Sequence, residues 1–103
     1  MPNMIRISRK GDENVAVPFG VIDEEICAHF GAKVSEHQYY RGWYDAVGYS
    51  AKENFADIIQ SYEKRQAEET NAPEGLRKHR DDMIKIMKFL DENFVLKAWY
   101  SAY

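Results

Sequence analysis

Side chains that could ligate a metal are few and scattered in this sequence. The nitrogen and sulfur candidates are Cys27, His29, His37 and His79. Their spacing matches no standard zinc module, in which ligands come in closely spaced pairs. The sequence therefore predicts no metal site, and it contains no motif for a bound cofactor.

Groups for nucleophilic or acid–base catalysis are present but carry no catalytic pattern. Cys27 lacks a local signature with a base and an orienting group, and a thiol in a short amphipathic segment usually packs as a small hydrophobe. The paired carboxylates fall at predicted helix ends or on exposed faces, where solvation explains them: Asp23–Glu25, Glu68–Glu69, Asp81–Asp82 and Asp91–Glu92. We expect a protein that is not an enzyme, and a small enzyme of unknown type is one alternative.

Positive charge concentrates in the segment 76–93. Its basic residues are Arg77, Lys78, Arg80, Lys85 and Lys88. Such a cluster could contact phosphates if it lay on one side of a helix. Acidic residues alternate with it, and the whole chain has 17 acidic and 14 basic side chains, a net charge of -3. A nucleic-acid-binding regulator using helix 76–93 is therefore a second alternative, while a balanced surface helix explains the same residues.

The segment with the strongest functional indication is aromatic. Tyr, Trp and Arg, the residue types enriched in interface hot spots, occur together between positions 39 and 45. The predicted partner-binding residues are Tyr39, Tyr40, Arg41, Trp43, Tyr44 and Asp45. The competing interpretation is that some of these aromatic side chains build the core, as they often do in small proteins.

Size and composition favour one folded domain over residues 1–103. Apolar residues make up 45% of the 103 and aromatic residues 14%, which is sufficient for a hydrophobic core. A single cysteine and the lack of an amino-terminal apolar run favour a reducing, cytoplasmic location. No apolar stretch approaches the roughly 20 residues that span a bilayer, so we expect no membrane association of that kind.

The amino-terminal third contains strand and helix signals. Alternation of apolar and polar residues at 5–7 and 15–19 predicts a β-hairpin around a polar loop at 9–14. Pro18 lacks an N–H donor, so it should end the second strand or place it at a sheet edge. A short helix is predicted over 23–30, with Asp23 as its N-cap and Gly31 as its terminator.

Two longer helices are predicted in the second half, after a connector. Residues 32–49 have neither a helical nor a strand period, which predicts an irregular or short-strand segment. Ser50 and Glu53 have the spacing of a capping box, which predicts a helix from Ser50 to about Glu69. Pro73 suits the first turn of a second helix, which should end near 91–93.

These elements predict an α+β fold. It would consist of a small antiparallel sheet packed against one short and two longer helices. Residues 94–103 could extend the last helix or add a strand to the hairpin, and we expect the extended form. A mostly α-helical bundle is the alternative. We expect a small non-enzymatic protein that acts by binding a protein partner, like bacterial or phage-encoded inhibitors and adaptors, and a homodimer is compatible with its surplus of aromatic residues.

Overall fold

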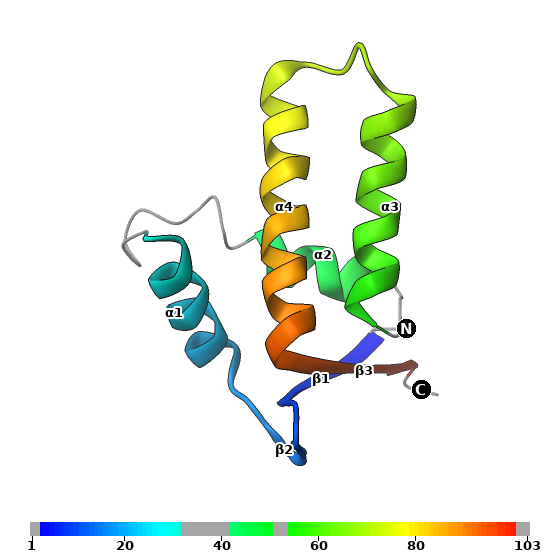
Figure 1. Cartoon of the computed structure of the whole chain (residues 1–103). Helices are drawn as coiled ribbons and strands as arrows, with labels where there is room; N and C mark the ends of the chain where they lie inside the picture. Colours follow the sequence, from blue (N-terminus) through cyan, green and yellow to red (C-terminus); the bar gives the residue numbers. More distant parts are fainter. Residues whose placement is uncertain (1–2, 32–41, 51–53, 101–103) are drawn as a thin grey trace.

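The computed structural model describes residues 3–31, 42–50 and 54–100. Three strands form an antiparallel sheet in the order β2-β1-β3, and four helices pack with it. Figure 1 shows the sheet at one end of the molecule, with α3 and α4 standing away from it as a long antiparallel helical hairpin. The predicted α+β fold is confirmed, and the alternative all-helical bundle is wrong because the sheet joins segments from both ends of the chain.

The amino-terminal hairpin has a tighter turn than its sequence predicts. Strand β1 spans Asn3–Arg9 and β2 spans Asp12–Ala16, so the loop predicted at 9–14 is largely strand. Gly11 permits the short turn because its φ of 84° lies in the left-handed region. Strand β2 ends before Pro18 and lies at a sheet edge, as predicted.

Strand β3, Phe94–Tyr100, pairs with β1 along its whole length. The register places Ile7 opposite Leu96, and both side chains are buried. The predicted extended carboxy-terminal segment is therefore confirmed. Because β1 lies between β2 and β3, it is the central strand of the sheet.

Helix α1 spans Phe19–Phe30 and starts earlier than predicted. Pro18 occupies the N-cap position, so the prediction of Asp23 as N-cap is wrong. Ile22 and Ile26, four residues apart, are fully buried and fix the face that α1 turns to the core. Gly31 ends the helix in the left-handed conformation, as predicted.

Helix α2, Gly42–Ser50, replaces most of the predicted irregular connector. Trp43 and Val47 are four residues apart, and each is 1% exposed. Two glycines make this segment a poor helix former in isolation, so burial of the Trp43 face outweighs intrinsic propensity. The rest of the predicted connector, residues 32–41, lies outside the described residues.

Helix α3, Phe55–Glu68, begins later than the capping box predicts. Ser50 is the last residue of α2, so its prediction as the N-cap of this helix is wrong, and residues 51–53 lie outside the described residues. The N-cap is Asn54, whose Oδ1 accepts a hydrogen bond of 2.9 Å from the Asp57 backbone N–H.

Helix α4 spans Glu74–Asn93, close to its predicted bounds. Its buried stripe continues the core formed by the sheet and the other helices. That core contains Ile7, Ile22, Ile26, Trp43, Val47, Phe55, Ile58, Ile59, Met83, Ile86, Met87, Leu90, Phe94 and Leu96. Every helix and both paired strands β1 and β3 contribute to it.

Polar contacts rather than apolar ones close the far end of the α3–α4 hairpin. Arg77 Nη1 donates to the backbone oxygen of Glu69 at 3.0 Å, and Gln66 Nε2 donates to that of Arg77 at 2.7 Å. Arg80 is buried and forms an ion pair with Glu69. The helix pair therefore stays aligned beyond the point where the hydrophobic core ends.

Candidate functional site

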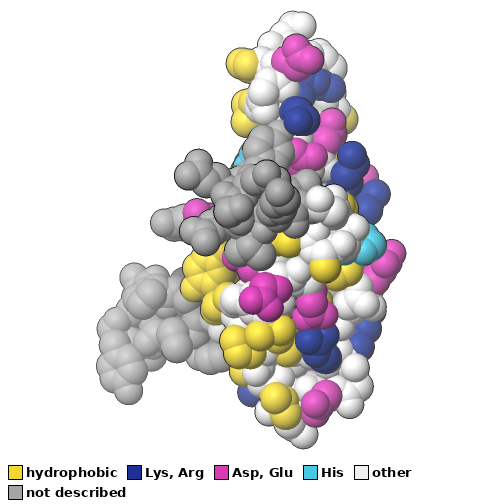
Figure 2. All heavy atoms as spheres, turned by 90° about the vertical axis from the view of Figure 1, so that its left-hand side faces the viewer, with side chains coloured by type: hydrophobic (Ala, Val, Ile, Leu, Met, Phe, Trp, Pro, Cys, Tyr) yellow, Lys and Arg dark blue, Asp and Glu magenta, His cyan; other side chains and the backbone are white. Residues whose placement is uncertain are grey.

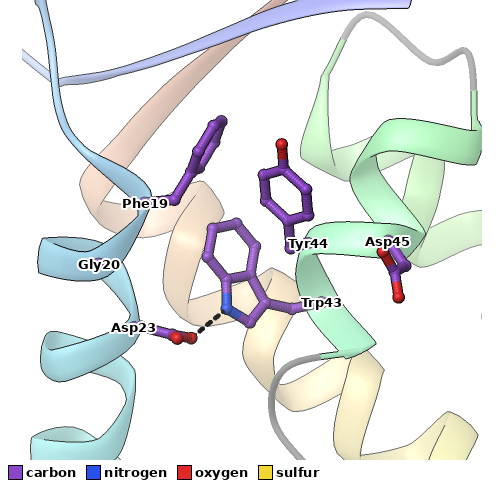
Figure 3. A pocket seen from close by; sticks show the side chains of 6 residues that line it. All are labelled: Phe19, Gly20, Asp23, Trp43, Tyr44 and Asp45. Atoms are coloured by element: carbon purple, nitrogen blue, oxygen red, sulfur yellow. Dashed lines mark hydrogen bonds between the residues drawn. The ribbon is translucent and has the colours of Figure 1, made fainter.

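A pocket of about 380 Å³ lies between the amino-terminal halves of α1 and α2. Its lining residues are Phe19, Gly20, Asp23, Trp43, Tyr44 and Asp45. Figure 3 shows the pocket with Trp43 placed between the two helices and with Phe19 and Tyr44 side by side. Two short segments far apart in the sequence thus form one surface.

Trp43 connects the two helices at this pocket. Its indole Nε1–H donates a hydrogen bond of 2.7 Å to Asp23 Oδ1, and its side chain is part of the core. A buried indole N–H normally requires such an acceptor, so the bond fixes both side chains. Asp23 Oδ2 makes no hydrogen bond within the described residues, and it is not among the buried polar atoms that lack a partner. One carboxylate oxygen therefore holds Trp43, and the other makes no hydrogen bond to a described residue.

The aromatic side chains of the pocket pack against one another. Phe19 and Tyr44 meet edge to face, with ring centroids 4.4 Å apart and planes at 79°. Trp43 lies near both, with its ring centroid 6.1 Å from that of Phe19 and 6.0 Å from that of Tyr44. Tyr44 is nevertheless 44% exposed, which leaves much of a large apolar side chain available at the surface. These contacts hold it in place without burying it.

The described residues that line the pocket carry a net negative charge. Asp23 and Asp45 contribute carboxylates, and none of the six described lining residues is basic. Figure 3 shows the two carboxylates on opposite sides of the aromatic group. Gly20 adds open space, because nothing lies within 4 Å of where a Cβ on it would stand. In Figure 2, acidic and exposed hydrophobic side chains lie next to each other on the face that turns α1 to the viewer.

The structure separates the roles of the predicted partner-binding residues. Trp43, at 1% exposure, belongs to the core. Tyr44 and Asp45 are exposed and line the pocket. Tyr39, Tyr40 and Arg41 lie outside the described residues.

Sequence reasoning missed the contribution of α1 to this surface. Phe19 was expected at the end of a strand and Asp23 at a helix cap, and neither position indicates proximity to Trp43. Only tertiary packing brings them together. The spacing of Trp43 and Val47 was a usable signal for a helical face, but two glycines obscured it.

Cys27 lies one helical turn beyond Asp23 in α1 and is buried. Burial raises the pKa of its thiol, and the negative charge of Asp23 raises it further. A raised pKa keeps the group as a neutral thiol near pH 7, the opposite of an activated nucleophile.

Metal-ligating side chains do not converge in the described ranges 3–31, 42–50 and 54–100, where no group of three or more His, Cys, Asp or Glu residues could hold an ion. His29 instead stacks on Phe89, with ring centroids 4.4 Å apart. The histidine therefore contributes to packing between α1 and α4.

The basic residues of α4 do not form one free surface. Arg77 donates to the end of α3, and Arg80 is buried against Glu69. Lys78, Lys85 and Lys88 are exposed, but exposed acidic residues of the same helix lie among them. Arg77 and Arg80, on which a nucleic-acid interface would rely, thus already have structural partners.

A second depression, of about 420 Å³, lies at the turn between α3 and α4. It is lined by residues 68–73 and Leu76, whose side chain is 41% exposed. No aromatic residue lines it, so it lacks the rigid apolar surface that distinguishes the pocket between α1 and α2.

None of the helices in the described part of the chain combines the length and the apolar character needed to cross a bilayer. Comparisons with protein-family models, with curated proteins and with solved structures find no significant match.

Proposed function

We propose that this protein is a protein-binding module whose contact surface is the pocket between α1 and α2. The supporting observation is the exposed edge of Tyr44, held against Phe19 and bordered by the carboxylates of Asp23 and Asp45. An aromatic side chain fixed in place loses little conformational entropy on binding, and such residues dominate interface energetics. Acting by contact in this way is how inhibitors and adaptors work.

The geometry of the pocket suits a protein partner. The pocket is open, and its described lining residues come from two helices, which position a binding site more precisely than loops do. Trp43 supports the surface from beneath, so its substitution would test the fold rather than the interface. Substitution of the exposed Tyr44, in contrast, would test the interface without disturbing the core.

The experiment is affinity capture with the wild-type chain, followed by identification of the captured protein and titration calorimetry with that purified partner. Tyr44→Ser should weaken binding by about ten-fold or more, as expected for an interface hot spot. Leu76→Ser is the matched control, because Leu76 is similarly exposed but lies at the hairpin turn. It should change the affinity by less than about two-fold.

Circular dichroism of both variants establishes that each retains the fold. If folded Tyr44→Ser binds the partner as tightly as the wild type does, the proposed surface is wrong. If Leu76→Ser is the variant that loses binding, the interface lies at the α3–α4 turn instead.

A further inference from the structure

We propose that the pocket binds a cationic side chain, lysine or arginine, presented by the partner protein. This inference rests on the proposed function and specifies the chemistry of the partner. Its basis is the combination of two carboxylates and three aromatic rings among the described residues that line one pocket, none of which is basic.

The first step is charge. Asp45 is exposed, and Asp23 has one oxygen free of hydrogen bonds within the described residues. The two carboxylates lie on opposite sides of the aromatic group (Figure 3), so a cation entering the pocket would approach either one of them, and within the described residues neither carboxylate forms an ion pair that the cation would have to displace. An anionic side chain would meet two like charges, which disfavours binding.

The second step concerns the position of each carboxylate in its helix. Asp45 lies in the first turn of α2, where it also stabilises the helix dipole. Asp23 has no such explanation, because it is the fifth residue of α1 and its orientation is set by Trp43. The N-termini of α1 and α2 each carry a partial positive charge of roughly half a unit, and together they amount to less than the two carboxylate charges nearby.

The third step is shape. Long cationic side chains bury an apolar stem and keep their charged head near water or a counter-charge. The exposed part of Tyr44 and the open space over Gly20 provide an apolar path for the stem. The volume of about 380 Å³ is near the lower end of the roughly 300–1,000 Å³ of small-ligand sites, which suits one side chain. Aromatic rings add a favourable cation–π contribution.

The test is an NMR titration of the full 103-residue chain with N-acetyl-arginine N-methylamide. The control probe is the citrulline analogue, which has nearly the same shape but no charge. Saturable shifts of the Trp43 indole N–H and of the Gly20 and Asp45 amides should occur with the arginine probe and be at least five-fold weaker with the citrulline probe. Equal responses to both probes, or no saturable response to the arginine probe or to its lysine counterpart, would overturn the proposal.

Charge-neutralising variants provide a second readout. Asp23→Asn keeps an oxygen that can accept from Trp43, so the pocket should retain its shape. Asp23→Asn and Asp45→Asn should each weaken binding of the arginine probe by about two- to five-fold, the size expected for exposed charge pairs. Glu63→Gln, at an exposed position of α3, should leave it unchanged. If the two aspartate variants bind like the wild type, the carboxylates do not select the ligand.

The two proposals can fail separately. A captured partner whose binding depends on Tyr44, but not on any lysine or arginine of its own, would leave the protein-binding function intact and refute the cationic ligand. Selective arginine binding without a Tyr44-dependent protein partner would support the cation site and refute the protein-binding function.

Discussion

The ion pair between Arg80 and Glu69 can be removed from either side, and we expect the two substitutions to change the free energy of unfolding by different amounts. The Arg80 side chain is 8% exposed, whereas that of Glu69 is 53% exposed. Glu69→Gln would leave a buried guanidinium without its counter-charge. Arg80→Met would remove the charge itself, together with the buried Nη1 that has no hydrogen-bond partner.

The magnitudes follow from the burial of each partner. Breaking a fully buried ion pair costs about 3–5 kcal/mol, whereas an exposed pair contributes about 0–1 kcal/mol. Since the Glu69 carboxylate is half in water, we expect Glu69→Gln to lower the free energy of unfolding by about 1–2 kcal/mol. Arg80→Met preserves the apolar stem, so it should stay within about 1 kcal/mol of the wild type.

The assay is urea unfolding followed by circular dichroism on the two single variants and the double variant. The double variant should match Arg80→Met alone, because the cost of Glu69→Gln requires the buried charge. Glu68→Gln is the control, since the pair that Glu68 forms with Lys64 at 3.9 Å is exposed and should contribute less than about 0.5 kcal/mol. A larger loss for Arg80→Met than for Glu69→Gln, with additive effects in the double variant, would refute the reasoning.

Two further predictions concern the start of α3 and the thiol of α1. Asn54→Ala should lower the free energy of unfolding by about 1 kcal/mol in a urea titration, because it removes the N-cap of α3. Ser50→Ala lies before α3 begins and should change this free energy by less than about 0.5 kcal/mol. If Ser50→Ala were the more destabilising variant, Ser50 and not Asn54 would be the N-cap of α3. The raised pKa of Cys27 means that alkylation by iodoacetamide should reach its half-maximal rate at higher pH in the folded protein than in urea, and Asp23→Asn should lower that midpoint. Because the folded state favours the neutral thiol, this contribution to stability is complete below the unfolded pKa and is lost as the pH rises through the folded pKa.

Helix α4 could be predicted because its signals are local and agree with one another. Pro73 marks its start and an apolar stripe runs through it, whereas the dense large residues after Asn93 indicate burial either as a continued helix or as a strand. The start of α3 was also readable in principle. Asn54 directly precedes Phe55, the first residue of the apolar stripe, and an N-cap is expected at that position.

The candidate site could be predicted only in part, because it depends on contacts between distant segments. Tyr44 and Asp45 have interface-type side chains that are visible in the sequence. Asp23 was expected to cap a helix, but it accepts a hydrogen bond from Trp43 instead. A carboxylate near the start of a helix can do either. The packing of α2 against α1 decides between these two roles, and no local sequence pattern indicates that packing.

The position of β1 in the centre of the sheet has a consequence for the order of folding. Its ladder with β3 pairs Asn3 with Tyr100 and Arg9 with Phe94, so each pair closes a loop of nearly the whole chain. The α3–α4 hairpin needs only local contacts, which form faster than long-range pairing. During synthesis one edge of β1 would therefore stay unpaired until β3 has been made, and the pairing of β1 with β3 should form last.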